Sequence, residues 1–237
     1  MKKFSWTDAI SYGWNTTRSN LVFFIVLMLI LGIVVVLPDK LVVLPTEPGA
    51  LLKSSKFWVV TAISLLIQQL VLLSFIKINL EFTRNAKPEF SDLVDALSHY
   101  IPYLIGSIIY SIAVGIGFML LVVPGVYIAI RYGFFSYFII DRGEGVKDSF
   151  ESSSFITRGA MKELFVLGLI LLGVNAVGLI LGYISIGVVT TILINKTVGA
   201  FISFAGLLIT VPITMLAIAY VFRRLTAKRT RTAPRPS

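Results

Sequence analysis

The sequence predicts an all-α, polytopic membrane protein with six transmembrane helices, and three observations lead to that fold class. First, 57% of the residues are apolar and 14% are charged, whereas soluble domains carry about 25% charged residues. Second, apolar runs close to the roughly 20 residues that cross a bilayer recur along the chain. Third, Lys and Arg gather at the ends of these runs and in the C-terminal tail, as the positive-inside rule requires.

We expect one transmembrane domain over residues 1–222. Its six predicted spans cover about residues 21–37, 57–80, 101–123, 124–140, 164–186 and 198–222. Residues 223–237 are basic and contain proline, so we expect a disordered cytoplasmic tail. Asp8 interrupts the N-terminal stretch and no small-residue cleavage site follows, which argues against a cleavable signal.

The positions of the 21 Lys and Arg residues predict that both termini are cytoplasmic. Lys77 and Arg131 fall inside spans, and nearly all the others would share one side of the membrane. The exceptions are Lys40, Lys53, Lys56 and Lys196. An even number of spans with this asymmetry places both chain ends on the basic, cytoplasmic side. All three tryptophans fall at predicted interfaces, where an aromatic belt is expected.

Proline and glycine predict how the spans are joined. Pro124-Gly125 is a turn dipeptide, so the third and fourth spans should form a tight hairpin at the outer face. The segment 38–56 is proline-containing and is expected to be an extended outer loop. Residues 184–195 are apolar but too short to cross, and we favour a re-entrant or interfacial segment over the continuation of a long tilted helix. Pro212 predicts a kink in the last span.

Three similar stretches suggest an internal repeat. They are FSWTDAISYGW at residues 4–14, FSDLVDALSHY at 90–100 and GVKDSFESSSF at 145–155. Each precedes a pair of spans, so we interpret the chain as three hairpins, each with an amphipathic interfacial helix before it. In the first stretch the predicted face contains Trp6, Ala9, Ile10, Gly13 and Trp14. The alternative is that any helix entering a membrane is amphipathic at its start.

Small residues predict where helices approach closely. Ser107, Ser111 and Gly115 recur every four residues in the third span. Small side chains at this spacing allow two helix backbones to come together. We therefore expect this face of the third span to contact another helix.

Four polar residues are expected at a central depth in the bilayer: Arg131, Gln68, Gln69 and Asn175. A charge there costs about 2.5–3.5 kcal/mol, so Arg131 should face protein or water, with the amides as partners. We interpret the four residues as a candidate ligand-binding set for an anionic group such as a lipid phosphate. The alternative is that Arg131 bonds to backbone carbonyls and amides and fixes helix packing. Lys77 is expected to extend its amine to the membrane surface.

The sequence argues against several kinds of chemistry. There is one histidine and no cysteine, so no cofactor or metal site built from these ligands is expected. No catalytic or nucleotide-binding motif occurs. The acidic residues near 141–151 are better explained as a solvated turn than as a cation site. Anionic membrane lipids are therefore the expected partners, with further proteins as possible partners and no role for nucleic acid.

The stretch PGVYIAIRYGFFSYFIIDRGEGVKDSFESSSFITRG at 124–159 resembles a group of bacterial and archaeal integral membrane proteins of unknown function. That group is related to the membrane domain of some glycerophosphodiester phosphodiesterases. The resemblance depends on residues spread over this stretch: Pro124, Gly125, Tyr127, Arg131, Tyr132, Asp141, Gly145, a serine at 152 or 153, Thr157 and Gly159. It implies a six-span helical fold in the cytoplasmic membrane of a bacterium or archaeon, with no catalytic activity of its own.

These observations favour a non-enzymatic membrane protein that binds or transports a membrane-associated ligand. The second hypothesis is a structural or accessory scaffold that organises lipid or partner proteins. A lipid-modifying enzyme has the least support, because the sequence contains no recognisable catalytic motif.

Overall fold

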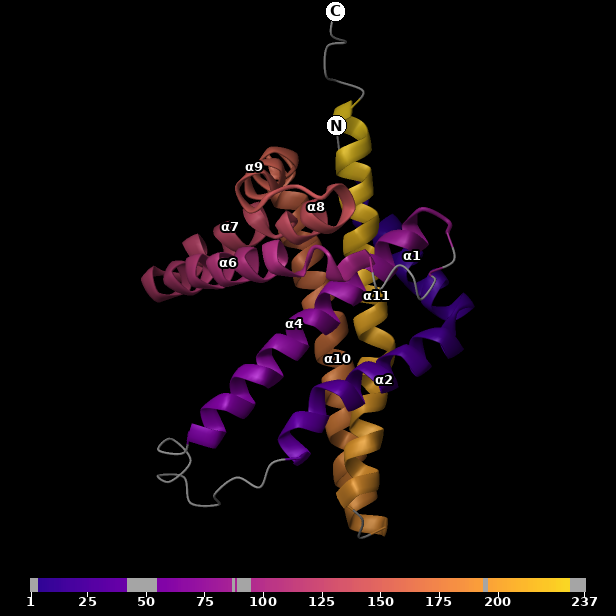
Figure 1. Ribbon diagram of the computed structural model, residues 1–237. Coiled ribbons are helices and arrows are strands. Elements are labelled where there is room, and N and C mark those ends of the chain that lie inside the picture. Colours follow the sequence, from indigo (N-terminus) through magenta and orange to yellow (C-terminus); the bar gives the residue numbers. More distant parts are fainter. Residues whose placement is uncertain (1–3, 42–54, 87, 89–94, 194–195, 231–237) are drawn as a thin grey trace, which may run out of the picture.

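The computed structural model describes residues 4–41, 55–86, 88, 95–193 and 196–230. Within these ranges the chain is helical apart from short connections, which confirms the all-α fold class (Figure 1). In chain order the helices are α1 (Trp6–Ser19), α2 (Leu21–Leu41), α4 (Ser55–Thr83), α6 (Tyr100–Leu120), α7 (Val122–Tyr132), α8 (Phe135–Arg142), α9 (Val146–Thr157), α10 (Met161–Leu193) and α11 (Lys196–Thr230).

Several of these helices are long and apolar enough to cross a membrane. Among the described residues there are five such segments: 55–83, 100–120, 122–142, 161–180 and 207–227. A sixth is reached when α1 and α2 count as one span, bent by 88° between them. A multi-pass membrane protein is thus supported, whereas the three-hairpin repeat and its interfacial helices stay predictions. Residues 90–94 of the second predicted interfacial helix lie outside the described residues.

Three helices extend farther than the sequence suggested. α10 is one helix from Met161 to Leu193, so the preferred re-entrant interpretation of 184–195 is wrong and the long-helix alternative holds up to Leu193. α11 continues to Thr230, so the first part of the predicted disordered tail is helical. α2 includes Pro38, which had been assigned to the outer loop. α2 and α11 continue beyond their apolar runs, because hydropathy marks hydrocarbon contact and not the end of a helix, whereas the extension of α10 is itself apolar.

The turn between the third and fourth predicted spans lies at Leu121, not at Pro124-Gly125. Leu121 is extended, with φ −166° and ψ 157°, and separates α6 from α7. Pro124 instead sits in the first turn of α7, where its missing N–H costs no helix hydrogen bond. Gly125 packs against α6, because a Cβ on Gly117 would lie 2.8 Å from the Gly125 Cα. α6 and α7 do form a tight hairpin, but Gly125 allows the two helices to pack closely and does not form the turn.

The small-residue face of α6 also differs from the prediction. A Cβ added to Gly115 would have no atom within 4 Å, so this end of the predicted stripe contacts nothing. The close approaches are at Gly117 and at Gly106, where an added Cβ would lie 2.8 Å from the Phe135 ring. The close helix contacts of α6 are therefore made at Gly106 and Gly117, and not at the end of the predicted four-residue series, Gly115.

α1 packs against α11 through small side chains. Ala9, Gly13 and Thr17, spaced by four residues, are its buried residues. A Cβ on Gly13 would lie 2.5 Å from the carbonyl oxygen of Ile213, which is next to Pro212 inside α11. The buried face includes Ala9 and Gly13 as expected, but Trp6 and Trp14 are exposed.

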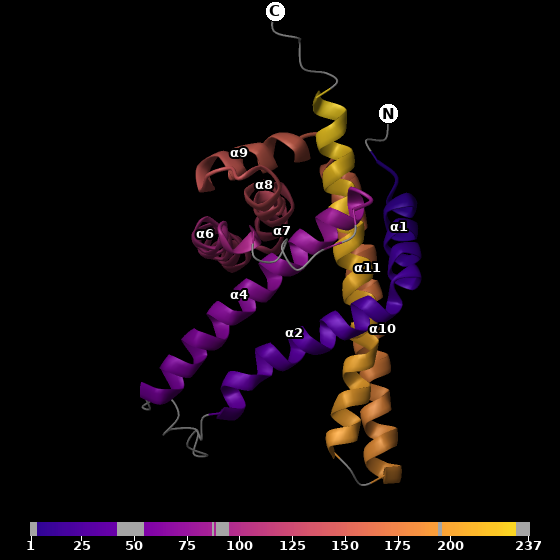
Figure 2. The same cartoon turned by 45° about the vertical axis from the view of Figure 1, so that its right-hand side comes forward.

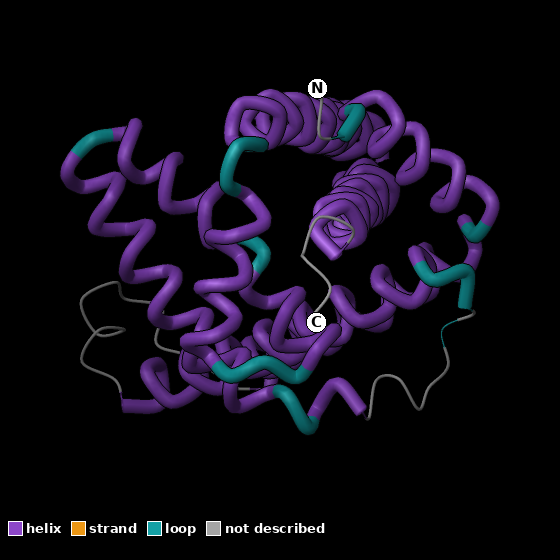
Figure 3. The backbone as a smooth tube through the Cα atoms, turned by 90° about the horizontal axis from the view of Figure 1, so that it is seen from above, coloured by secondary structure: helices purple, strands orange, loops and turns teal. Residues whose placement is uncertain are grey.

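The helices are arranged around the long α10–α11 pair (Figures 1 and 2). α2 and α4 run obliquely to this pair, whereas α6 and α7 run across it. The view from above shows the C-terminal helix close to end-on, with the other helices spread around it (Figure 3). The main apolar core joins α8 to the beginning of α10 and the end of α11, through residues such as Phe138, Leu167 and Phe222.

We predict that Gly13→Ala destabilises the fold by about 1–3 kcal/mol, because the new methyl group meets backbone and cannot be relieved by a side-chain rotation. Thermal unfolding of the purified full chain in detergent measures the effect. Gly115→Ala is the matched control, since its methyl group enters open space and alanine favours a helix over glycine. Equal unfolding temperatures for the two variants would contradict the close α1–α11 contact.

Candidate functional site

The guanidinium of Arg131 lies at the end of α7 and is partly exposed. Its Nη1 donates a hydrogen bond of 2.7 Å to the hydroxyl of Tyr127. The guanidinium carbon also lies 5.6 Å from the centre of the Tyr127 ring, within the range of a cation–π contact. The two residues are four apart and therefore neighbours on one helix face. Their spacing was readable in the sequence, although Tyr127 was not predicted as the partner.

The backbone of Arg131 has a separate role, because the predicted fourth span breaks into α7 and α8 just after it. The Ser153 hydroxyl donates a hydrogen bond of 3.1 Å to the Arg131 carbonyl. The Thr157 hydroxyl lies 3.1 Å from the same carbonyl and 2.9 Å from the Ser153 carbonyl, so its single proton is shared between these two acceptors. The Phe134 N–H donates in turn to the Ser153 hydroxyl, over 3.1 Å. A break in a helix leaves carbonyl and N–H groups without partners. We call these three hydrogen bonds the hydroxyl clasp.

The sequence of α9 explains why the clasp forms. Ser149, Ser153 and Thr157 recur every four residues and are fully buried, so one face of α9 is both small and hydroxylated. Such a face brings the hydroxyls close to another backbone. Phe150 adds apolar contact through a stacked pair with Phe135, whose ring centres are 4.9 Å apart. The face formed by Ser149, Ser153 and Thr157 is therefore a packing face of α9.

The clasp places Arg131 next to a polar helix. α9 also carries Lys147 and Glu151, whose side chains are 87% and 69% exposed. Charged side chains with such exposure favour water or lipid headgroups over hydrocarbon. The exposed charges of α9 therefore lie close to the break that follows Arg131, and the central depth expected for Arg131 stays a prediction.

The other three predicted site residues lie elsewhere. Asn175 donates 2.7 Å to the hydroxyl of Thr214 and so joins α10 to α11. Gln68 and Gln69 lie in the middle of α4 and are partly buried. Within the described part of the chain, no hydrogen bond links any of these amides to Arg131. The grouping of all four around one ligand remains a prediction, and Arg131 with Tyr127 is the pair that the structure brings together.

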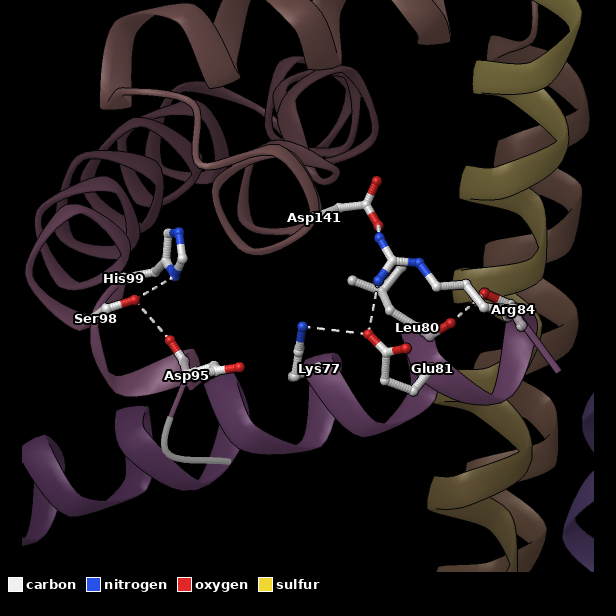
Figure 4. A network of polar contacts seen from close by, with 9 residues as sticks. Lys77, Leu80, Glu81, Arg84, Asp95, Ser98, His99 and Asp141 are labelled. Carbon is white, nitrogen blue, oxygen red and sulfur yellow. Dashed lines mark hydrogen bonds and ion pairs between the residues drawn. The ribbon is translucent and has the colours of Figure 1, made fainter. Parts of the chain in front are cut away.

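A chain of ion pairs links α4 to α8 (Figure 4). Glu81 accepts from Lys77 over 3.2 Å and from Arg84 over 2.7 Å. Arg84 also contacts Asp141 at the end of α8, again at 2.7 Å. The Lys77 amine, expected to reach for the membrane surface, is instead held by Glu81. No local pattern in the sequence predicts the pairing of Arg84 with Asp141, because the two are 57 residues apart in the chain.

The residues that carried the family resemblance gather at this junction of α7, α8 and α9. Tyr127 and Arg131 pair on α7, Asp141 holds Arg84, and Ser153 and Thr157 form the clasp. Gly159, which lies between α9 and α10, has a φ of +78°, a conformation that favours glycine. Most of the pattern thus has a structural explanation, and the guanidinium of Arg131 is the part that the clasp leaves unexplained.

The described residues contain no group of three or more His, Cys, Asp or Glu side chains that could hold a metal ion. Comparisons with protein-family models, with curated proteins and with solved structures found no match. The family resemblance therefore stays an expectation from the sequence, and the functional argument depends on the site itself.

We predict that Ser153→Ala lowers the free energy of unfolding by about 1–3 kcal/mol, the usual cost of leaving a buried hydrogen-bonding group unpaired. The Phe134 N–H would lose its acceptor. Denaturation of the full chain in detergent, followed by near-UV circular dichroism, measures the change. Ser152→Ala removes a hydroxyl from the neighbouring position outside the clasp, and should be close to neutral. A neutral Ser153→Ala would show that the clasp does not stabilise the junction.

We also predict that Arg84 and Asp141 are energetically coupled. A double-mutant cycle with Arg84→Gln and Asp141→Asn should give about 0.5–1 kcal/mol, since the partly exposed arginine is screened by solvent. The same cycle for Lys147 and Glu151, which are 3.9 Å apart and highly exposed, should give no measurable coupling. Additive effects at Arg84 and Asp141 would contradict an ion pair that joins α4 to α8.

Proposed function

We propose that the protein is a non-enzymatic membrane protein that binds the anionic headgroup of a membrane-associated ligand through Arg131. The observation that supports this most directly is a partly exposed guanidinium at the polar end of the bundle, with a tyrosine hydroxyl as its hydrogen-bond partner. Lipid phosphate is the chemical group that best fits such a position.

The separation of backbone and side-chain roles favours ligand binding over packing. The clasp uses the carbonyl oxygen of residue 131, which any amino acid would provide. The guanidinium is therefore not needed to hold the helix break together. The guanidinium contacts the Tyr127 hydroxyl and is otherwise partly exposed, so its charge is available to an anion.

Arg131 also differs from neighbouring cations. Lys77 and Arg84 are paired with Glu81, and Arg142 lies 3.8 Å from Glu144. In the described part of the chain, no carboxylate comes within ion-pair distance of Arg131. A guanidinium has five N–H donors, and Tyr127 uses one of them. The remaining donors suit the two-oxygen edge of a phosphate group.

We predict that Arg131→Gln weakens binding of phosphatidylglycerol about tenfold or more, the effect of losing a hydrogen bond to a charged group. Native mass spectrometry of the detergent-solubilised full chain measures the bound lipid. Binding of phosphatidylcholine should change much less, because its headgroup has no net charge. Arg131→Lys keeps the positive charge but loses the planar edge of the guanidinium. Its affinity for phosphatidylglycerol should therefore fall between that of the unchanged protein and that of Arg131→Gln.

Arg224 provides a matched control. It donates 2.9 Å to the hydroxyl of Tyr220, also four residues earlier, and lies 5.0 Å from that ring. Arg224→Gln therefore removes the same charge and the same kind of tyrosine contact from α11. If both variants lose phosphatidylglycerol equally, general electrostatic attraction explains the binding and the site at Arg131 is rejected.

A further inference from the structure

The α6–α7 hairpin lies at one end of the long helix pair. The chain continues into α8, and three rings at its start pack against Phe222 of α11. The ring-centre distances to Phe222 are 6.0 Å from Phe134, 5.3 Å from Tyr137 and 5.1 Å from Phe138. On α10 the same core includes Leu164, Leu167 and Leu171, in the first turns of the helix. The remainder of both long helices extends away from this layer (Figures 1 and 2).

The lengths of the long helices place this layer relative to a bilayer. From Leu167 to the end of α10 at Leu193 the helix rises roughly 39 Å, at 1.5 Å per residue. The distance from the start of α11 at Lys196 to Phe222 is also roughly 39 Å. A hydrocarbon core is about 30 Å thick. If the far ends of α10 and α11 reach the opposite surface, the hairpin lies near the boundary where the charged helix α9 is found.

The hairpin also has the wrong direction for crossing beside the long pair. α6 and α7 run across α10 and α11 in Figure 1, and are seen nearly end-on in Figure 2. One bilayer normal cannot lie along both sets of helices. α6, and α7 together with α8, are long and apolar enough to cross a membrane, but length and composition do not determine the direction of a helix.

The outer face of α6 is apolar and is exposed in the part of the chain that the structure describes. Ile105, Ile112 and Met119, spaced by seven residues, are 47%, 57% and 89% exposed. The exposed apolar surface continues through the turn at Leu121 and into Val122. Its opposite side packs on α7 and α8 through Gly106 and Gly117. An exposed apolar surface of this size marks a contact with a membrane or with another protein, and its extent along the whole helix suits acyl chains.

We infer that the α6–α7 hairpin does not cross the membrane but lies in its plane, with the outer face of α6 against the acyl chains of one leaflet. The charged surface of α9 would face the water or headgroups on the same side. This assignment does not depend on the proposed ligand at Arg131. It replaces two of the six predicted spans with an embedded hairpin, and moves the turn at Leu121 away from the outer water.

Depth measurements with nitroxide labels test this inference. The chain has no cysteine, so single labels can be attached to Ile105→Cys, Ile112→Cys and Met119→Cys in the full chain in liposomes. Power-saturation EPR with oxygen and a water-soluble nickel complex then gives the depth of each label. For a spanning helix, steps of seven residues change the depth by about 10 Å. For a hairpin in the plane, the three labels share one depth.

The matched control is a series on α10. Phe165, Leu172 and Leu179 have the same seven-residue spacing and are also exposed, so labels there should differ by about 10 Å per step. We expect this gradient on α10, and on α6 equal depths with high oxygen collision rates. A gradient on α6 like that on α10 would overturn the inference. Low collision rates for oxygen at all three α6 labels would also overturn it, since protein and not lipid would then cover the face.

Discussion

The hydroxyl clasp is the interaction on which the arrangement of this protein depends most directly. Apolar helices adhere to one another through weakly directional packing, so burial alone does not fix where one helix stops and the next begins. At the α7–α8 break, Ser153 donates to the Arg131 carbonyl and accepts from the Phe134 N–H, and the Thr157 hydroxyl is a second, shared donor near that carbonyl. In surroundings with little water these groups have few other partners. The clasp thus fixes the positions of three helices relative to one another.

The electrostatic counterpart of the clasp is the ion-pair chain from Lys77 to Asp141. Its four charges cancel, and Glu81 is buried to the point where an unpaired carboxylate would be unfavourable. Together the clasp and the ion pairs hold both ends of α8, whose residues from Phe135 to Ile140 are all buried. α8 is therefore the short central element that the surrounding helices cover, and α7 with Arg131 is attached to it directly.

How far the sequence predicts this structure depends on the property concerned. Apolar runs predicted where helices occur, since hydrocarbon selects for length and composition. They did not predict helix direction, helix ends beyond the apolar run, or the break at Gly133. Arg131 was identified because charge is conspicuous in an apolar segment. Ser153 and Thr157 were not recognised as its backbone partners, because contacts between distant segments leave no local pattern. Asn175 was placed with Arg131 by depth alone, and depth does not determine which helices are neighbours.

The contact of Gly13 with Ile213 joins the first described helix to the last one. During synthesis the chain emerges from its N-terminus, so α1 is complete long before its docking surface on α11 exists. The small-residue face of α1 therefore stays uncovered until α11 has been synthesised. The contact between α1 and α11 then forms late in assembly. A translation product that stops before α11 would keep the Tyr12 contact with α4 but leave the small-residue face of α1 uncovered.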